Sequence, residues 1–324
     1  MPIIKAALLG LGTVGEGVYE VIQTSQEQLK KLLGAEVKVV GILIQDPEKQ
    51  RQVAKDVLVT TDFEEILAIP GLNVIFESII GDDPTVSYLK RAIEQGCHII
   101  TANKAMFAKH GAVLQQKALE HDVEIAFEAT VAAGVPIIRT IKQQLQINKI
   151  ERIQGLLNGT SNFILTEMRK NQLPFSDVLK QAQELGYAEA DPTNDVEGYD
   201  AFYKLMILSQ LAFGRQPNWD EVDLSGIASI PNEQIRTASG RYKHIAEIQK
   251  VGNEIKASVK PVLTDENHPL YNVEGVDNAI VLETNLAGKI TIQGPGAGSK
   301  PTASAMIEDF IHIFQSKKAT SVLV

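Results

Sequence analysis

Cysteine is almost absent from this chain, because Cys97 is the single one among its 324 residues. No disulfide can form within the chain, and a zinc site built from several cysteines is excluded. Disulfides are rare in reducing compartments, so the composition fits a cytoplasmic protein. Cys97 follows Gly96 at a predicted helix–strand junction, a position more typical of a small buried residue than of a nucleophile.

A surplus of positive charge and long apolar runs are missing as well. The formal net charge is −9, whereas a nucleic-acid partner requires a basic field that pairs with phosphates. Apolar stretches such as Leu205–Leu208 are far shorter than the roughly 20 residues that span a membrane. The six histidines show no metal-ligand spacing. We therefore expect a soluble protein with neither a secretory signal, a membrane span nor a nucleic-acid partner.

The first part of the chain alternates apolar runs with amphipathic stretches. The apolar runs predict strands at Lys5–Leu9, Val37–Ile44, Val57–Thr60, Val74–Glu77, His98–Thr101 and Val123–Glu128. The stretches between them predict helices at Val14–Leu33, Phe63–Ala68, Pro84–Gln95 and Gly111–His121. Strands that alternate with helices predict an α/β fold with a parallel, doubly wound sheet.

The pattern changes after Pro136. Helices are expected at Ile137–Leu145, from about Ser161, at Val196–Phe213 and at Thr302–Gln315. Strands are expected at Ile150–Leu157, Tyr242–Val251, Ile255–Val262 and Ala279–Thr284. Alternating segments of this kind predict a mostly antiparallel sheet, with one face open to a partner.

The segment GLGTVG at Gly10–Gly15 matches the dinucleotide fingerprint G-x-G-x-x-G. It follows a predicted strand and opens a predicted helix, which is the context that the fingerprint requires and which disfavours an ordinary glycine-rich turn. The first glycine makes the turn, the second lets the backbone approach a pyrophosphate, and the third packs helix on strand. We therefore expect a cofactor to be bound by Gly10, Gly12, Thr13, Val14 and Gly15.

The end of the second strand should carry a residue that reads the cofactor's ribose, and Gln45 and Asp46 are the candidates. An Asp accepts hydrogen bonds from ribose hydroxyls and favours NAD. Nearby Lys49 and Arg51 are suited to the 2′-phosphate of NADP. The alternative, that these residues form an ordinary solvated loop, is equally favoured. The choice between NAD and NADP therefore stays open.

Two lysines stand in positions that suit catalysis. Lys104 follows a predicted buried strand, whose carboxyl end should face the ligand crevice, although an exposed surface lysine is the alternative. Asp200 and Lys204 are four residues apart and share one face of a helix that is apolar nearly all round. Buried charges need partners or a task, so this pair is either a structural ion pair or part of a site.

Taken together, six segments resemble homoserine dehydrogenases. They are GLGTVG at Gly10–Gly15, TANK at Thr101–Lys104, EATVAAGVPII at Glu128–Ile138, GLLNGTSNFIL at Gly155–Leu165, LGYAEADPTNDVEGYDAFYKL at Leu185–Leu205 and GPGAGSKPTASAM at Gly294–Met306. They occur in the family's order and cover nearly the whole chain. The first is shared by many enzymes, but the TANK, EATV and GYAEADP blocks together are highly specific.

The resemblance implies NAD(P)-dependent interconversion of L-homoserine and L-aspartate 4-semialdehyde, in amino-acid biosynthesis toward threonine and methionine. It implies that Lys104 and Lys204 are catalytic and that Glu189 and Asp200 bind the substrate's α-ammonium group. Aldehyde reduction develops negative charge on oxygen, which an ammonium can stabilise and protonate. We expect Lys204 to be the proton donor and Lys104 to assist it.

The resemblance also implies the domain layout and further ligands. A Rossmann-type dinucleotide-binding domain would comprise residues 1–136 and 302–324, with an α+β substrate-binding and dimerisation domain inserted at 137–301. The chain would form a homodimer through the sheet of that domain, and the loop with Gly296 and Gly298 would cover the nicotinamide. A monovalent cation, Na⁺ or K⁺, would be held by the main-chain oxygens of Glu128, Val131, Ala133 and Val135.

The chain departs from the family pattern at two places. Gln45-Asp46 stands where an Arg-Asp pair is common, which leaves the cofactor preference open, and the loop Glu77–Gly81 lacks the usual paired glycines. Many relatives carry an additional C-terminal ligand-sensing domain. The sequence ends soon after its last predicted helix, so feedback inhibition by threonine through such a domain is not expected.

Two other functions compete with this hypothesis. A catalytically silent NAD(P)-binding regulatory protein of the same fold would not need Lys104, Glu189, Asp200 and Lys204, all of which are present. A phosphorylating semialdehyde dehydrogenase would need a reactive cysteine with an activating base, and Cys97 lies in the wrong context.

Overall fold

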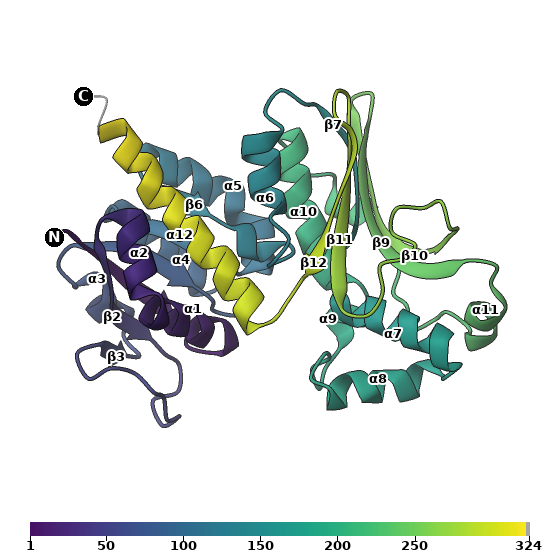
Figure 1. Ribbon diagram of the computed structural model, residues 1–324, viewed down its shortest axis with the longest axis horizontal. Coiled ribbons are helices and arrows are strands. Elements are labelled where there is room, and N and C mark those ends of the chain that lie inside the picture. Colours follow the sequence, from purple (N-terminus) through teal and green to yellow (C-terminus); the bar gives the residue numbers. More distant parts are fainter. Residues whose placement is uncertain (322–324) are drawn as a thin grey trace. The chain divides into compact units, whose positions relative to one another are not determined.

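The computed structural model describes residues 1–321 and divides into two compact units. The first unit consists of Met1–Ala133 and the C-terminal segment that begins at Gly298. The second unit is Gly134–Ala297. Each unit has a sheet of its own, with β1 to β6 in the first and β7 to β12 in the second. Figure 1 labels β2, β3 and β6 of the first sheet and β7, β9, β10, β11 and β12 of the second.

A six-stranded parallel sheet forms the centre of the first unit, in the order β3-β2-β1-β4-β5-β6. Its strands are β1 at Ile3–Leu9, β2 at Glu36–Leu43, β3 at Leu58–Thr60, β4 at Leu72–Glu77, β5 at His98–Thr101 and β6 at Ile125–Ala126. The strand order reverses between β1 and β4, and ligands bind beyond the carboxyl ends of the strands at such a switch point. The predicted doubly wound parallel sheet is therefore confirmed.

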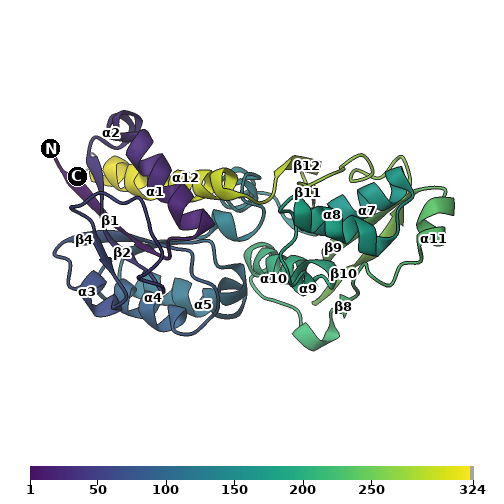
Figure 2. The ribbon, with the colours of Figure 1, turned by 90° about the horizontal axis from the view of Figure 1, so that it is seen from below.

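Helices cover both faces of this sheet. They are α1 at Thr13–Thr24, α2 at Gln26–Leu33, α3 at Phe63–Leu67, α4 at Thr85–Glu94, α5 at Lys104–Glu120 and α12 at Ser299–Ser321. Figure 2 shows α1, α2 and α12 on one face and α3, α4 and α5 on the other. On the first face, Phe310 of α12 is fully buried, with its ring centroid 5.6 Å from that of Phe76 in β4. The C-terminal helix is thus part of the core of the first unit.

Three helix predictions were wrong in their limits. The helix predicted at Val14–Leu33 is two helices, because the backbone leaves helical geometry at Ser25, where φ is −108° and ψ is 20°. The helix predicted from Gly111 begins at Lys104; a Cβ on Gly111 would meet the Phe107 ring 2.9 Å away, so this glycine belongs to a packed helix interior. The helix predicted at Val196–Phe213 is interrupted by Gly198, whose φ of +90° is not helical.

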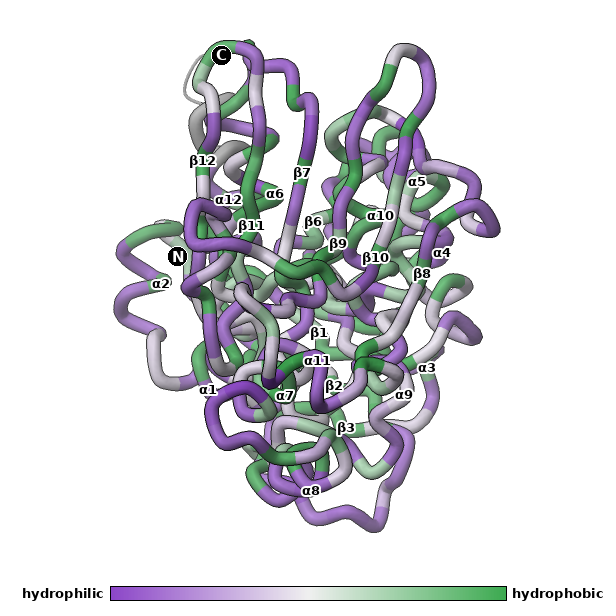
Figure 3. Tube along the Cα trace, turned by 90° about the vertical axis from the view of Figure 1, so that its right-hand side faces the viewer, coloured by the Kyte–Doolittle hydropathy of each residue, from purple (hydrophilic) through white to green (hydrophobic). Residues whose placement is uncertain are grey.

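The second unit contains a sheet in the order β12-β11-β7-β9-β10-β8. Its strands are β7 at Ile150–Leu156, β8 at Asp223–Leu224, β9 at Arg241–Val251, β10 at Glu254–Thr264, β11 at Asp277–Thr284 and β12 at Gly288–Pro295. Neighbours pair antiparallel except for β8 and β10, which confirms the mostly antiparallel prediction. Figure 3 shows β12, β11, β7, β9 and β10 side by side, with hydrophilic and hydrophobic residues mixed along them.

The second unit also contains helices. They are α6 at Ile137–Arg139, which continues as a π-helical turn at Thr140–Gln144, α7 at Gly159–Asn171, α8 at Phe175–Glu184, α9 at Thr193–Val196, α10 at Tyr199–Phe213 and α11 at Asn232–Thr237. Both α7 and α10 pack against β9. Among the helices of residues 1–321, none has the length and apolar character needed to cross a membrane.

Candidate active site

The glycine motif forms the turn between β1 and α1. Gly10 has a φ of +97°, and a Cβ on Gly15 would overlap the carbonyl oxygen of Gly10, so both positions require glycine for backbone packing. A Cβ on Gly12 would meet no atom within 4 Å. The space in front of Gly12 therefore lies open at the N-terminus of α1, where backbone N–H groups and the helix dipole favour a pyrophosphate.

The start of α12 lies beside this turn. The Ser299 hydroxyl donates to the carbonyl oxygen of Thr13 at 2.8 Å, and Gly298, with a φ of +113°, directly precedes it. Gly296 belongs to the second unit, where it is buried and a Cβ would overlap the Asn278 side chain. The structure thus brings Gly298, but not Gly296, to the glycine turn within one unit.

Gln45 and Asp46 lie in an exposed loop that follows β2. The Asp46 carboxylate accepts from the backbone N–H of Glu48 at 2.9 Å. The Arg51 guanidinium donates to the carbonyl oxygens of Asp46 and Lys49 at 2.6 and 2.7 Å. The acidic and basic candidates for reading the ribose therefore belong to one loop, at the carboxyl end of the strand beside β1.

Lys104 is the first residue of α5 and is half-buried, at the carboxyl end of β5. The preceding Asn103 caps the helix, since its side-chain oxygen accepts from the backbone N–H of Met106 at 3.1 Å. The same side chain donates to the carbonyl oxygens of Ile79 and Gly81 at 2.9 and 2.8 Å. Lys104 is therefore fixed at the ligand-facing edge of the sheet and is not a fully exposed surface lysine.

A buried carboxylate that was not predicted as a site residue lies at the same edge. Glu77 ends β4 and has no exposed surface. Its two oxygens accept from the Ile79 backbone N–H at 2.7 Å and from the Thr101 hydroxyl at 2.5 Å. Burial nevertheless raises the pKa of Glu77 to about 7, because desolvation outweighs these hydrogen bonds. The available signal was a charged residue at the end of an apolar strand.

The second unit contains a buried charged cluster centred on Lys204. Lys204 and Asp200 are 7% and 4% exposed, and the ammonium lies 2.7 Å from the Asp200 carboxylate, as the spacing on one helix face predicts. The Lys204 ammonium also donates to the carbonyl oxygen of Leu157 at 2.6 Å. Two groups from separate segments therefore fix the position of this ammonium.

Three further polar residues belong to the cluster, and none of them was predicted as a site residue from the sequence. The Asn158 amide donates to Asp195 at 2.7 Å and to Asp200 at 3.0 Å, and the Asn278 amide donates to the Leu157 carbonyl at 2.9 Å. Asn158 follows β7 and caps α7, so its place between an apolar strand and a helix was the available signal. Asp195 and Asn278 come from distant segments that only the fold brings together.

The cluster contains carboxylates as well as an ammonium. Asp195 and Asp200 contribute the carboxylates, and Lys204 contributes the ammonium. A buried carboxylate of this kind can pair with the ammonium group of an amino acid. Glu189 lies in an exposed loop before α9, where its carbonyl oxygen accepts from the Gln183 side chain at 3.1 Å.

The four residues predicted to hold a cation lie in the segment that leaves the parallel sheet. Glu128, Val131 and Ala133 belong to the first unit, and Val135 belongs to the second. Ala133 has a φ of +39°, a left-handed conformation that is unusual for a residue other than glycine. Within residues 1–321, no cluster of three or more His, Cys, Asp and Glu side chains is suited to a metal ion. A cation here would thus depend on main-chain oxygens.

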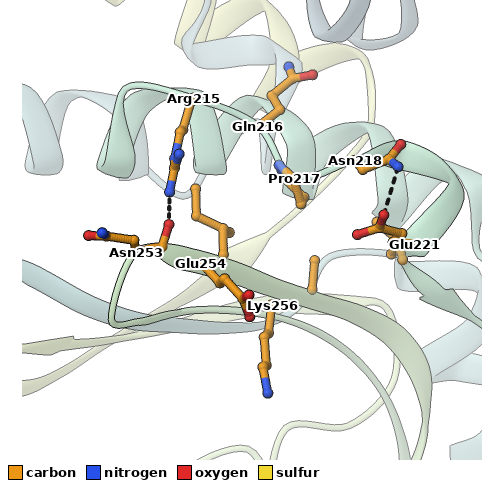
Figure 4. Close-up of a pocket in the computed structure, with 11 residues that line it drawn as sticks. Arg215, Gln216, Pro217, Asn218, Glu221, Asn253, Glu254 and Lys256 are labelled. Atoms are coloured by element: carbon orange, nitrogen blue, oxygen red, sulfur yellow. Dashed lines mark hydrogen bonds between the residues drawn. The ribbon is translucent and has the colours of Figure 1, made fainter.

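A separate surface pocket of about 540 Å³ lies between the end of α10 and the turn from β9 to β10 (Figure 4). Arg215 donates to the carbonyl oxygen of Asn253 on one side, and Asn218 donates to Glu221 at 3.0 Å on the other. The lining residues include none of the predicted site residues. The pocket is therefore not our candidate for the substrate site.

The parallel sheet, the glycine turn and the polar residues at its carboxyl edge define a nucleotide-binding oxidoreductase of two units. Family models narrow the class. Residues 10–128 match the model "Homoserine dehydrogenase, NAD binding domain", and residues 136–311 match the model "Homoserine dehydrogenase". The chain belongs to the homoserine dehydrogenase family.

Individual relatives agree with the family models. A homoserine dehydrogenase of Bacillus subtilis (strain 168) is 40% identical over 323 residues, which cover 98% of this chain and 74% of that protein. The crystal structure of a homoserine dehydrogenase from Thiobacillus denitrificans has a TM-score of 0.93 at 38% identity, over 98% of this chain and 75% of that one. A hyperthermophilic archaeal homoserine dehydrogenase in complex with NADPH has a TM-score of 0.83 at 28% identity, over 96% and 97%.

These findings confirm the predicted family, fold class and activity. The chain is an oxidoreductase that acts on a CH–OH group with NAD(P) and interconverts L-homoserine and L-aspartate 4-semialdehyde. The alternative of a catalytically silent regulatory protein is not favoured. The geometry within each unit supports roles for individual residues.

Proposed function

We propose that Lys204 is the proton donor for reduction of L-aspartate 4-semialdehyde and that Lys104 assists it. The supporting observation is the buried Lys204 ammonium, which Asp200 and the Leu157 carbonyl hold in one place. A preorganised ammonium in a desolvated cluster can stabilise the charge that develops on an aldehyde oxygen.

The chemistry follows from the positions of these groups. The bound nicotinamide supplies a hydride to the aldehyde carbon. As the C=O electron pair moves to oxygen, Lys204 stabilises the resulting alkoxide and donates a proton from Nζ, which gives the hydroxyl of homoserine. Asp200 accepts from the ammonium at 2.7 Å and orients it throughout. In the opposite direction the neutral amine of Lys204 takes the hydroxyl proton.

Asp200 and Glu189 then bind the substrate's α-ammonium group. The burial of Asp200 beside Lys204 and Asn158 supports this role, because it places a desolvated carboxylate next to the proposed proton donor. Glu189 is exposed, so it would contribute from the loop that precedes α9. Pairing a desolvated carboxylate with an ammonium is strongly favoured, and loss of one partner is costly.

The cofactor is NAD or NADP. We assign its binding to Gly10, Gly12, Thr13, Val14, Gly15, Gln45, Asp46, Lys104, Gly296 and Gly298. The open space at Gly12 suits a pyrophosphate at the N-terminus of α1. The loop with Asp46 and Arg51 offers both an acceptor for ribose hydroxyls and a cation for a 2′-phosphate, so this loop would decide between the two cofactors.

We further propose a monovalent cation, Na⁺ or K⁺, on the main-chain oxygens of Glu128, Val131, Ala133 and Val135. The left-handed conformation of Ala133 supports a backbone shaped for a ligand. A homodimer through the sheet of the second unit and a cytoplasmic location complete the proposal. Side chains of β12 alternate between exposed and half-buried, as on a sheet edge available to a partner, and the single cysteine, Cys97, is buried and unbridged.

The decisive experiment compares Lys204→Ala with wild type. We expect kcat to fall by about 10²–10⁴-fold, the usual contribution of a general acid, while NAD(P)H binding persists in a fluorescence titration. Lys180→Ala serves as a control, because Lys180 is an exposed lysine of α8. Turnover of Lys204→Ala within a few-fold of wild type would remove Lys204 from the mechanism.

A further inference from the structure

The buried carboxylate of Glu77 joins two loops at the carboxyl edge of the parallel sheet. One loop is Ser78–Gly81, which follows β4, and the other is the TANK segment, which follows β5. Glu77 accepts from Ile79 in the first loop and from Thr101 in the second. The chain thus places one fully buried carboxylate between two segments that are far apart in sequence.

The network continues from Thr101 to the cap of α5. The Thr101 hydroxyl accepts from the backbone N–H of Asn103 at 3.0 Å while it donates to Glu77. The Asn103 side chain in turn donates to the carbonyl oxygens of Ile79 and Gly81. A closed circuit of hydrogen bonds therefore runs from Glu77 through both loops to the residue that directly precedes Lys104.

The same circuit reaches the glycine turn. The backbone N–H of Ser78 donates to the carbonyl oxygen of Leu9 at 2.9 Å. A Cβ on Gly10 would lie 3.1 to 3.3 Å from Ser78 atoms, so the two loops are in close contact. Ser78 lies between Glu77 and Ile79, which the carboxylate connects. Glu77 is thus positioned to fix the Ser78 backbone against the glycine turn.

The circuit requires an acceptor at position 77. The carboxylate faces donors, namely the Ile79 N–H, the Thr101 hydroxyl and the Asn103 side-chain amide, and the Thr101 oxygen already accepts from the Asn103 backbone N–H. The side-chain NH₂ group of a glutamine would face either the Ile79 N–H or the Thr101 hydroxyl. In the second case the proton of the Thr101 hydroxyl would lose its acceptor. An isosteric change at this one atom therefore disturbs the circuit without changing the packed volume.

We propose that Glu77 is a positioning residue for the reaction: it connects the 78–81 loop with Thr101 and Asn103 and thereby orients Lys104 at the start of α5. This inference rests on the proposed role of Lys104. Burial makes the charged form of Glu77 costly, as its raised pKa shows, and a neutral side chain would avoid that cost. A fully buried carboxyl group that joins two loops beside Lys104 is consistent with a task in the site rather than with stability alone.

The experiment is a double-mutant cycle between Glu77→Gln and Lys104→Ala, with kcat measured at saturating substrate and cofactor. We expect Glu77→Gln to lower kcat by about 10–100-fold, because a displacement of about 1 Å has effects of this size. In the Lys104→Ala background the same change should lower kcat less than threefold. Thermal unfolding should show that Glu77→Gln is folded and no less stable than wild type at pH 8.

Substitutions at Thr101 provide an independent arm and a rescue. Thr101→Val removes the hydroxyl and should lower kcat as Glu77→Gln does, whereas Thr101→Ser keeps the hydroxyl and should restore most of the activity. The control is Thr85→Val, which removes another fully buried threonine hydroxyl, one with no hydrogen-bond partner among the described residues. Its kcat should equal that of wild type.

The possible outcomes separate this inference from the proposed function. If Lys104→Ala leaves kcat unchanged, Lys104 has no part in the reaction and both proposals fall. If Lys104→Ala lowers kcat but Glu77→Gln does not, or lowers it equally in both backgrounds, only the positioning role of Glu77 falls. Should Glu77→Gln fail to fold, Thr101→Val and Thr101→Ser decide: equal activity in these two variants would overturn the inference.

Discussion

The burial of Glu77 predicts that wild type loses stability relative to Glu77→Gln as pH rises. The pKa of this carboxyl is about 7 in the folded protein, against an ordinary value of 4.5. Between these values the folded state holds a proton that the unfolded chain has released. The stabilising contribution is therefore fully present below pH 4.5 and is lost as pH rises through 7. Each pKa unit corresponds to about 1.4 kcal/mol, so the loss amounts to about 3 kcal/mol.

The assay is urea unfolding followed by far-ultraviolet circular dichroism, for both proteins at pH 5 and at pH 8.5. Glutamine does not titrate, so the difference between the two free energies of unfolding isolates Glu77 from the other carboxylates. We expect this difference to shift by about 3 kcal/mol in favour of Glu77→Gln at the higher pH. A difference that stays constant within 1 kcal/mol, or that shifts toward wild type, would refute the reasoning.

Four further changes test the remaining assignments. Gly12→Val should abolish NAD(P)H binding in a fluorescence titration and leave the circular dichroism spectrum unchanged, because the valine side chain would enter the open space at the N-terminus of α1. An unchanged affinity for NAD(P)H would mean that the glycine motif is only a turn. Glu189→Gln should raise KM for homoserine far more than it raises Kd for the cofactor. It should also narrow the preference for homoserine over an analogue without the amino group. An unchanged ratio of kcat/KM for these two substrates would contradict the role of Glu189 in binding the α-ammonium group. Asp46→Asn should lower kcat/KM for NAD more than for NADP, and equal losses would exclude Asp46 from ribose recognition. Thr85→Val should increase the free energy of unfolding by about 1 kcal/mol, since a buried unpaired hydroxyl is removed; a lower Tm would contradict this.

Most of the correct predictions came from patterns within short segments of the sequence. The glycine motif was recognisable because turn, strand and helix lie within a few residues of one another. The contact between Asp200 and Lys204 followed from helical spacing. Helix limits were less predictable: Gly111 resembles a helix breaker in the sequence, but the Phe107 ring packs against it within α5.

Contacts between distant segments could not be derived in this way. Asn278 reaches the Leu157 carbonyl only because β11 pairs with β7 in one particular register. Glu77 meets Thr101 because β4 and β5 are parallel neighbours whose ends are level. Periodicity predicts which face of a strand is buried, but it contains no information on which strand lies beside it or in what register.

The first unit is assembled from both ends of the chain, and this has a consequence for synthesis on the ribosome. Residues 134–297 emerge before α12, so the second unit can fold while the parallel sheet still lacks the helix that covers one of its faces. Until α12 emerges, Phe76 lacks Phe310, and the carbonyl of Thr13 lacks the Ser299 hydroxyl. A nascent chain that stalls before Ser299 would thus expose an apolar face beside its glycine turn. Cofactor affinity should therefore appear only after α12 has emerged, so that dinucleotide binding would report on synthesis beyond Ser299.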